Sequence, residues 1–274
     1  MNFAYEKPKT ADALAALLTE GGSQASLLAG GTDLLGQLRA RLLEPKVVID
    51  IKGVQELSVL AHHGDGSATV GAAVVANRVV DDKRFQGPMA ALPMAAGRIA
   101  TYAIRNRATI AGNIANASPC ADSVPPLCVL GASIELRSSA GTRTLGMLDF
   151  IRGVRATVRR VDEYLAAIHI PAQGAGTRSL FRKHTRVRGH DLALANAAVL
   201  HDPERKRLRV AIGSCSPVPA LVELDDLFDS LDGEEAARRA MAAILPISDV
   251  RASREYRIDM TGVLVRRLFA DLKG

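Results

Sequence analysis

Short apolar stretches, separated by polar or glycine-rich breaks, divide the chain into predicted helices and strands. Apolar residues recur at helical spacing from 10 to 20, with Thr10 placed to cap this helix and Gly21-Gly22 to end it. An apolar run at 26–29 predicts a strand, and after a glycine turn 33–42 and 47–51 predict a helix and a second strand. We therefore expect a small mixed unit that ends near residue 55.

The middle of the chain combines predicted β-hairpins with short helices. The predicted strands are 58–61, 68–71, 133–137, 142–145 and 164–170, and the predicted helices are 77–82, 88–100 and one that begins near 122. Residues 111–119 are rich in Gly, Asn, Ser and Pro, so they are predicted to form a loop. His62 and His63 fall in the first hairpin turn, where a solvated turn is favoured over a metal site.

The last third of the chain places strands before helices, an order typical of an α+β domain. Ala172 to Gly176 is small and uncharged and is the best linker candidate. The predicted strands are 179–185, 192–200 and 208–213, with a turn at 201–206, and the predicted helices are 234–245 and 256–272. We therefore expect domains at 1–172, with subdomains of about 1–55 and 56–172, and at 173–274.

Composition narrows the classes of function. The chain has 274 residues, of which 48% are hydrophobic, and its net charge is +6. Aromatic residues are only 4% and Trp is absent, so few stacking platforms for nucleic acid exist. The densest basic stretch, Arg178 to Arg188, belongs to no recognisable nucleic-acid-binding motif. We expect no nucleic-acid partner.

Cysteine usage and the N-terminal sequence favour a reducing compartment. The three cysteines show no CxxC spacing, so neither a disulfide framework nor a zinc site is predicted, and three thiols alone do not ligate an iron–sulfur cluster. The first ten residues lack a signal-peptide pattern, and no apolar run is long enough to span a bilayer. We expect a cytoplasmic protein without a membrane span.

A first candidate binding motif lies between the early strand and helix. Ala29, Gly30, Gly31, Thr32 and Asp33 follow the strand directly. Two glycines let the backbone approach a ligand, and successive N–H groups before a helix can form a concave anion site. The motif is neither a dinucleotide fingerprint nor a P-loop. On its own it fits an ordinary turn as well as a phosphate site.

A second motif, 108–122, packs small, amide and hydroxyl side chains into fifteen positions. Thr109, Gly112, Asn113 and Asp122 could hydrogen-bond a polyhydroxylated ligand that lies close to the backbone. An Asx-rich structural loop has the same composition, so this motif alone leaves both interpretations open.

Taken together, the two motifs resemble the FAD-binding subunits of the xanthine dehydrogenase and carbon monoxide dehydrogenase family. These subunits carry segments similar to AGGTDLL and TIGGNI…SPxAD, and the same order occurs here. Phe181-Arg182-Lys183 with Arg186 and Asp191 resembles a third segment of that family. Residues 252–257 and 263–267 resemble its C-terminal helix signature. The similarity covers nearly the whole chain.

The resemblance implies an α+β protein with a two-subdomain FAD-binding domain of the PCMH or vanillyl-alcohol-oxidase type and a smaller α+β domain. It implies FAD as the cofactor of this chain. It also implies a two-cluster iron–sulfur subunit and a molybdopterin subunit as partners, usually in a dimer of heterotrimers. In such enzymes electrons pass from the clusters through FAD to an external acceptor. The substrate pocket lies in another subunit, so we expect no catalytic residue here.

Residue roles follow from the resemblance by position. Residues 29–33 would cradle the FAD diphosphate, whereas Thr109, Gly112 and Asn113 would bind its phosphate and ribityl side. Asp122 would bond a ribityl or ribose hydroxyl. Lys183 would approach the isoalloxazine ring, where a cation favours the negatively charged reduced form. A surface lysine is the alternative for Lys183.

The chain departs from the family pattern in several places. Ala111 replaces a usual glycine, and its methyl is tolerated only if the backbone φ there is negative. Val187 replaces one member of a common Arg-Arg pair. Cys120 and Cys128 lie in a region too short for the extra cluster of some relatives, so both are expected to be buried thiols. His184 and His190 are expected to be ordinary surface or core residues.

Two other functions remain open at this level. One is a stand-alone FAD oxidoreductase of related fold, although the sequence shows no motif for a substrate-facing base. The other is a flavin-free scaffold for the partner subunits, against which the intact glycine and Asn113…Asp122 motifs argue.

Overall fold

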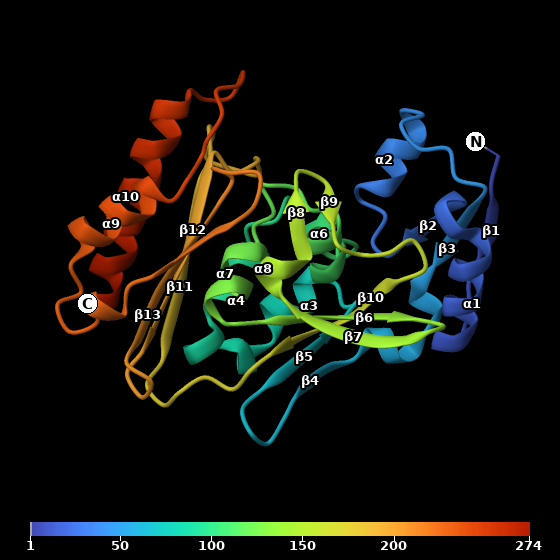
Figure 1. Cartoon of the computed structure of the whole chain (residues 1–274), viewed down its shortest axis with the longest axis horizontal. Helices are drawn as coiled ribbons and strands as arrows, with labels where there is room; N and C mark the ends of the chain where they lie inside the picture. The colour runs from blue at the N-terminus through green and yellow to red at the C-terminus, as the bar shows by residue number, and fades with distance from the viewer. Residues whose placement is uncertain (1) are drawn as a thin grey trace.

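Three β-sheets, each built from a separate stretch of chain, organise the protein (Figure 1). The computed structural model describes residues 2–274. The first sheet is parallel, with strand order β1-β3-β2. Its strands are β1 (Ala4–Glu6), β2 (Ala25–Leu28) and β3 (Val47–Asp50), and its helices are α1 (Ala11–Gly21) and α2 (Leu34–Arg39). Thr10 accepts a hydrogen bond from the Ala13 amide, which confirms the predicted cap of α1.

The second sheet is antiparallel, with strand order β4-β5-β10-β6-β7. Its strands are β4 (Leu60–His62), β5 (Ala68–Gly71), β6 (Ser133–Ser138), β7 (Gly141–Gly146) and β10 (Tyr164–Ile170). Six short helices and a small two-stranded sheet accompany it: α3 (Ala76–Asp81), α4 (Ala91–Ala96), α5 (Tyr102–Arg105), α6 (Ile110–Ala115), α7 (Val124–Val129), α8 (Met147–Phe150), β8 (Ile151–Gly153) and β9 (Ala156–Thr157). Both predicted hairpins of this region are confirmed.

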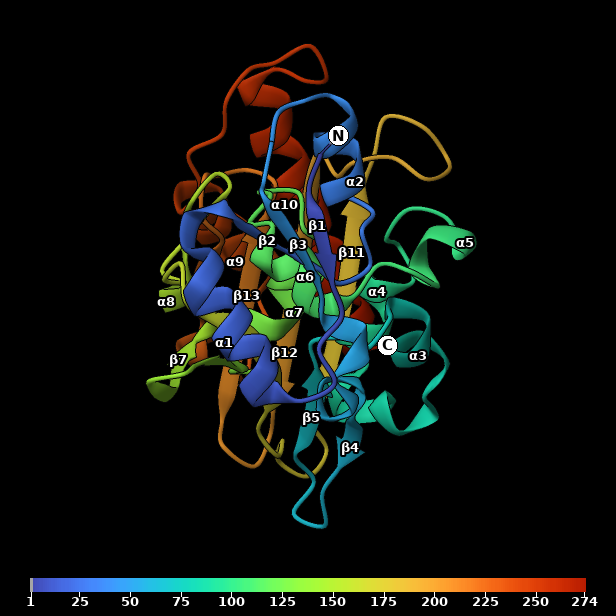
Figure 2. The same ribbon diagram turned by 90° about the vertical axis from the view of Figure 1, so that its right-hand side faces the viewer.

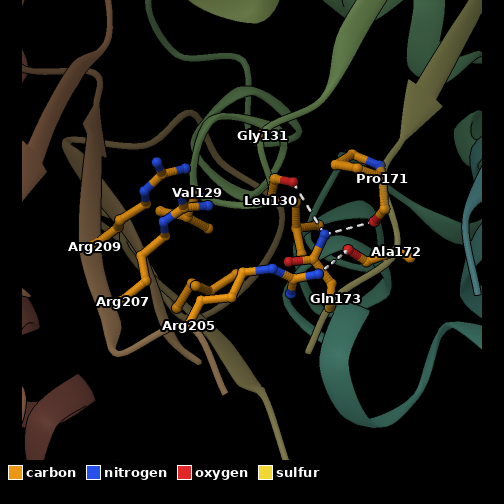
Figure 3. Close-up of a pocket in the computed structure, with 10 residues that line it drawn as sticks. Val129, Leu130, Gly131, Pro171, Ala172, Gln173, Arg205, Arg207 and Arg209 are labelled. Carbon is orange, nitrogen blue, oxygen red and sulfur yellow. Dashed lines mark hydrogen bonds between the residues drawn. The ribbon is translucent and has the colours of Figure 1, made fainter. Parts of the chain in front are cut away.

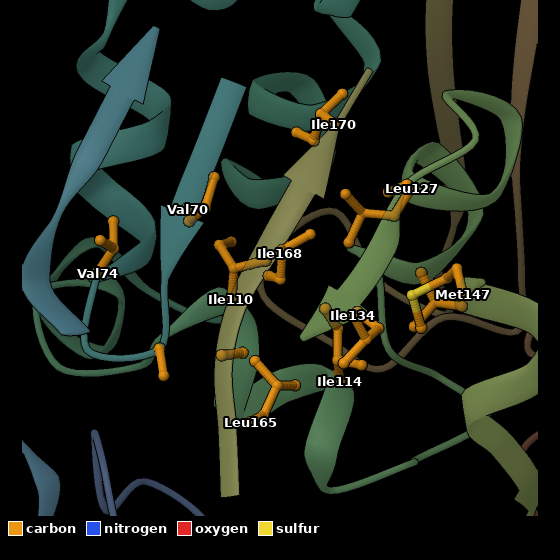
Figure 4. Close-up of a cluster of buried hydrophobic side chains, with 14 of the residues drawn as sticks. Val70, Val74, Ile110, Ile114, Leu127, Ile134, Met147, Leu165, Ile168 and Ile170 are labelled. Atoms are coloured by element: carbon orange, nitrogen blue, oxygen red, sulfur yellow. The ribbon is translucent and has the colours of Figure 1, made fainter. Parts of the chain in front are cut away.

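The second sheet and its helices share one apolar core (Figure 4). Ile168 in the central strand β10 pairs with Val70 of β5 and Ile134 of β6, and all three are fully buried. Ile110 and Ile114 of α6 pack into the same cluster. The core therefore fixes α6, which carries part of the second sequence motif, against the central strands.

The third sheet is antiparallel and is covered on both faces. Its strands, in spatial order, are β11 (Arg178–His184), β12 (Ala195–Asp202), β13 (Arg207–Gly213) and β14 (Ala220–Glu223). Ala197 and Val199 of β12 face helices α9 (Gly233–Ala242) and α10 (Arg254–Lys273). Ala198 and Leu200, one position along, join the core of the second sheet. Period-two alternation therefore gives two apolar faces.

Different elements lie at the two ends of the molecule. In Figures 1 and 2, α2 lies at one end and the turn of the β4–β5 hairpin lies at the other.

Of the helices in residues 2–274, none is both long enough and apolar enough to cross a membrane.

Several predicted boundaries are wrong. The 88–100 helix is reduced to α4 because Pro93 and Gly97 limit its extension. The strand predicted at 192–200 is β12, which runs to Asp202 and shortens the predicted turn. The short strands β1, β8, β9 and β14 were not predicted, since their few residues show little periodicity. His62 is not in a solvated turn, because it ends β4 and its ring packs edge-on against Phe85.

Candidate functional site

The glycine loop between β2 and α2 presents a row of free backbone donors. No hydrogen bond within residues 2–274 uses the backbone N–H of Gly30, Gly31, Thr32 or Asp33. Gly31 has a φ of 75°, a conformation that residues with a Cβ rarely adopt. Thr32 and Asp33 are exposed. Consecutive amides without acceptors, directly before a helix, form an arrangement suited to an anion.

A polar network of Lys52, Asp50 and Tyr5 fixes the position of the loop, and the sequence did not predict it. The Lys52 ammonium donates to the Ala29 carbonyl at 2.8 Å and lies 2.7 Å from an Asp50 carboxylate oxygen. The Tyr5 hydroxyl donates to the other Asp50 oxygen at 2.6 Å. These donors lower the pKa of Asp50 despite the opposing effect of its burial. The only local signal was the position of Asp50 and Lys52 at the end of the third strand.

Part of the second motif is helical, so the predicted loop at 111–119 is wrong for 111–115, whereas 116–119 are irregular as predicted. Residues Ile110–Ala115 form α6, and the Thr109 hydroxyl caps it by accepting from the Gly112 amide at 2.9 Å. Gly112 and Asn113 have low helix propensity, which concealed the helix, but the burial of Ile110 and Ile114 outweighs that cost. Ala111 is buried and does not have a positive φ, so its methyl group is tolerated.

The two motifs, some eighty residues apart, contact each other. A Cβ added to Gly30 would lie 2.1 Å from the Arg107 carbonyl oxygen, which shows how closely the backbones approach. Asn116, at the end of α6, donates to an Asp33 carboxylate oxygen at 2.8 Å. Arg155 donates to the Asn116 amide oxygen at 2.8 Å. The loop and α6 therefore form one surface.

A buried polar cluster connects α6 to Lys183. The Ser123 hydroxyl donates to the Asn113 amide oxygen at 2.7 Å. The next residue back, Asp122, accepts from the Lys183 ammonium at 2.6 Å and from the Asn196 side-chain amide at 2.9 Å. The side chains of Lys183 and Asp122 are only 4% and 5% exposed. Burial raises the pKa of Asp122, whereas Lys183 opposes that rise.

The structure thus brings all ten predicted site residues onto one connected path. It does not leave Lys183 on the surface, because the ammonium is buried against Asp122 and also donates to the Arg98 carbonyl at 3.1 Å. Asn196 was missed, since it lies in an apolar run and nothing local marks it. The individual roles of the ten residues toward a ligand stay predictions.

The remaining candidates lie around this path. Cys128 is buried, and burial raises the pKa of its thiol to about 12. Cys120 is only partly buried, so that prediction is wrong: the loop after α6 leaves it at the edge, where Arg251 lies 3.8 Å from its sulfur. Val187 is exposed, and the adjacent Arg186 pairs with Asp191. His184 is part-buried and contacts Tyr256.

Comparison with known proteins gives two matches that together span the chain. Residues 1–173 match the model of the family described as the FAD binding domain in molybdopterin dehydrogenase. Residues 179–272 match the CO dehydrogenase flavoprotein C-terminal domain. The ten predicted residues fall in both matched parts, with Lys183 alone in the second.

Individual relatives agree over nearly their full length. The carbon monoxide dehydrogenase medium chain of Hydrogenophaga pseudoflava is 31% identical, over 97% of this chain and 95% of its own. The xanthine dehydrogenase FAD-binding subunit of Escherichia coli O157:H7 is 30% identical, over 90% and 88%.

Solved structures show the same fold. A reconstituted CO dehydrogenase from Oligotropha carboxidovorans superposes with a TM-score of 0.89 at 28% identity, covering 97% of this chain and 96% of that one. Quinoline 2-oxidoreductase from Pseudomonas putida 86 gives 0.87 at 26% identity, over 99% and 96%. The predicted α+β fold class is confirmed.

Proposed function

The chain belongs to the family of FAD-binding subunits of molybdopterin-dependent dehydrogenases, and we propose that it holds FAD as the relay between iron–sulfur clusters on a partner subunit and an external electron acceptor. The chain is an oxidoreductase component, and FAD is its cofactor. Bound FAD supplies redox chemistry that protein side chains lack. The work of the chain is to bind, orient and electrostatically tune that group.

The glycine loop carries this proposal. A diphosphate is a compact anion rich in acceptor oxygens, and the four free amides of residues 30–33 offer donors without a competing partner. Gly31 permits the loop its left-handed turn, and Lys52 holds the loop from behind through the Ala29 carbonyl. The residues present therefore fit the diphosphate of FAD.

The buried cluster supports the rest of the site. Asn113 and Asp122 lie on the path that leads from the loop to Lys183, as an extended ligand requires. In this proposal Thr109, Gly112 and Asn113 face the phosphate and ribityl side, Asp122 faces a sugar or ribityl hydroxyl, and Lys183 sets the charge near the ring. Lys183 acts as a pair with Asp122, because the two groups are 2.6 Å apart.

The relatives named as medium chains and FAD-binding subunits imply that larger and smaller partner subunits accompany this one. We propose further that the partners are the two-cluster iron–sulfur subunit and the molybdopterin subunit, assembled as a dimer of heterotrimers in the cytoplasm. The boundary between a FAD-binding domain at 1–172 and a C-terminal domain at 173–274, and the division of the first near residue 55, belong to the same proposal.

The test compares Gly31→Val with Gly36→Ala in the holoenzyme purified through a tag on this chain. Valine is strained at a φ of 75° and crowds Leu28 and Leu35, so we expect loss of FAD with iron and molybdenum retained. Gly36, in α2, has open space for a Cβ, so Gly36→Ala should retain FAD. The purified proteins are assayed for FAD, iron and molybdenum.

Electron transfer is then measured directly. Clusters reduced with dithionite, after removal of excess reductant, should be reoxidised by an added acceptor in the wild-type and Gly36→Ala holoenzymes and far more slowly in Gly31→Val. Equal reoxidation in the FAD-free variant would refute the relay. Full FAD occupancy in Gly31→Val would refute the assignment of the loop.

A further inference from the structure

A cavity of about 230 Å³ lies where the end of α7, the segment after β10 and the β12–β13 hairpin meet (Figure 3). Three arginines of the hairpin, Arg205, Arg207 and Arg209, line one side of it, and Gly131 and Gln173 line the other. The proposed flavin site uses none of these residues. The cavity is therefore a separate feature of the molecule.

The three guanidinium groups differ in how far they are neutralised. Arg205 donates to Asp202 at 2.8 Å, and Arg209 donates to Glu223 at 2.8 Å. For Arg207 no ion pair forms with any residue of the described chain, 2–274. Because the two carboxylates lie outside the lining, the cavity wall itself has no acidic residue. One uncompensated positive charge and the remaining guanidinium N–H donors of its two neighbours face this space.

A second cavity of about 240 Å³ adjoins the first, and both are lined by Gly131 and Pro171. Its other lining residues include His63, Thr69 and His169, and again none is acidic. Thr69 lies 2.9 Å from His63 and 3.2 Å from His169. His169 also contacts Glu135 at 2.7 Å, but that carboxylate is not part of the cavity wall. The two cavities meet at Gly131 and Pro171, and we call them together the groove: guanidinium groups line the first, and hydroxyl and imidazole groups line the second.

The groove lies far from the proposed flavin site along the third sheet. In the strand register, Arg207 of β13 lies opposite Asp202 at the end of β12, whereas Asn196 of the buried cluster is the second residue of that strand. The two positions are six residue steps apart along the strand, which corresponds to roughly 20 Å. The hairpin turn that precedes Arg207 and the β4–β5 turn lie at the same end of the molecule, opposite α2 (Figure 1). A ligand in the groove would not touch a group held by residues 29–33.

We infer that this groove binds a small phosphate-bearing anion, with Arg207 as its principal cation. Guanidinium groups bind phosphate oxygens with fixed, often bidentate geometry, and an arginine without a carboxylate partner has all of its donors available. The groove joins the segment after β10 to the third sheet, so the anion would also bridge these parts. This inference goes beyond the FAD-dependent function and does not depend on that function.

The lining also limits which part of a ligand is recognised. No Phe, Tyr or Trp lines either cavity, and the cavity that holds Arg207 has no aromatic ring of any kind. Free phosphate or diphosphate and the phosphate group of a larger metabolite share the recognised chemistry. A nucleoside diphosphate should bind no more tightly than inorganic pyrophosphate, because no aromatic ring lies beside Arg207 to stack on its base.

The test is titration calorimetry of the full chain, saturated with FAD, with phosphate, pyrophosphate and ADP at constant ionic strength in chloride. FAD saturation blocks the other proposed diphosphate site. The variant Arg207→Gln removes the unpaired charge. The matched control Lys206→Gln removes one charge from the same hairpin, where the lysine does not line the groove and is replaced by another unbranched side chain at a φ of 49°.

We expect saturable binding of pyrophosphate that Arg207→Gln weakens about tenfold or more and Lys206→Gln changes by less than about twofold. At the same concentration, bound pyrophosphate should raise the melting temperature of the wild type more than that of Arg207→Gln. Equal weakening by both variants would show that the anion responds to the general positive charge of the surface, and this would overturn the site. The absence of saturable binding would also overturn it. Tighter binding of ADP would overturn the class of ligand. If the chain holds no FAD, the same pair of variants decides the question in the flavin-free protein.

Discussion

The buried pair of Lys183 and Asp122 offers a quantitative test of how the site is built. In the variant Lys183→Met, the Asp122 carboxylate loses its salt-bridge partner but keeps the Asn196 donor and its burial. Removing one partner of a buried ion pair costs about 3–5 kcal/mol. For a chain of this size that corresponds to a fall in melting temperature of roughly 6–20 °C.

The double variant Lys183→Met with Asp122→Asn separates the charge from the packing. It removes both charges together and can keep a hydrogen bond to Asn196. Its loss of unfolding free energy should therefore be smaller than the sum of the losses in the two single variants by about 1–3 kcal/mol. Asp122→Asn alone completes the cycle. The free energy of unfolding is measured by urea titration of the flavin-free chain with circular dichroism.

The dependence on pH has a definite sign. Burial already raises the pKa of Asp122 above its ordinary 3.8, and loss of Lys183 removes the main opposing group. A carboxyl whose pKa is higher in the folded than in the unfolded state binds its proton more tightly when folded. The deficit of Lys183→Met should therefore be small below pH 3.8 and increase as the pH rises through the folded-state pKa. A deficit below about 1 kcal/mol at pH 7, or one independent of pH, would refute this reasoning.

The same variants test the electrostatic role of the pair toward FAD. Lys183→Met leaves an uncompensated negative charge, so the flavin reduction potential should fall while much of the FAD stays bound. The double variant should recover part of that loss. An unchanged potential in Lys183→Met, measured against reference dyes, would refute the placement of Lys183 near the ring.

Three further predictions concern other parts of the fold. Gly30→Ala places a Cβ against the Arg107 carbonyl oxygen, so FAD content and melting temperature should both fall, whereas FAD retained at the wild-type level would mean that the loop shifts freely. Arg143, with help from Arg160, holds the pKa of Glu163 at about 2, so the wild type should lose roughly 1–2 kcal/mol of unfolding free energy as the pH falls from 4.5 to about 2, and Arg143→Leu should show a smaller loss in urea titrations across that range. Ile168→Ala, fully buried in the central strand, should cost roughly 2–5 kcal/mol, and a cost below about 1 kcal/mol would contradict the core described here.

Local signals predicted much of this fold. Thr10 and Gly21-Gly22 mark both ends of α1, because capping chemistry acts between residues that are close in sequence. The glycine loop and both hairpins of the second sheet were predicted for the same reason. The helix α6 was not, since low-propensity residues within it are outweighed by burial against distant strands.

The site was predictable as a set of residues but not as an arrangement. Lys183 and Asp122 are 61 positions apart, and no local pattern indicates that they pair. The Lys52 contact with the Ala29 carbonyl and the role of Asn196 likewise arise from tertiary packing. Resemblance to a family selected the candidate FAD-binding residues, whereas the structure shows that two of them, Lys183 and Asp122, form an ion pair.

The third sheet has a consequence for any attempt to recombine this protein with its relatives. Its strands are apolar on both faces, one against α9 and α10 and the other, through Phe181 and Leu200, against the core of the second sheet. If the chain is cut after residue 173, the second face of the sheet loses its cover in the C-terminal part. If the C-terminal part is exchanged between relatives, that face meets an N-terminal surface shaped for another sequence. Chimeras of these subunits should therefore retain solubility only when the residues of α4 and α7 that face β11 and β12 are transferred with the sheet.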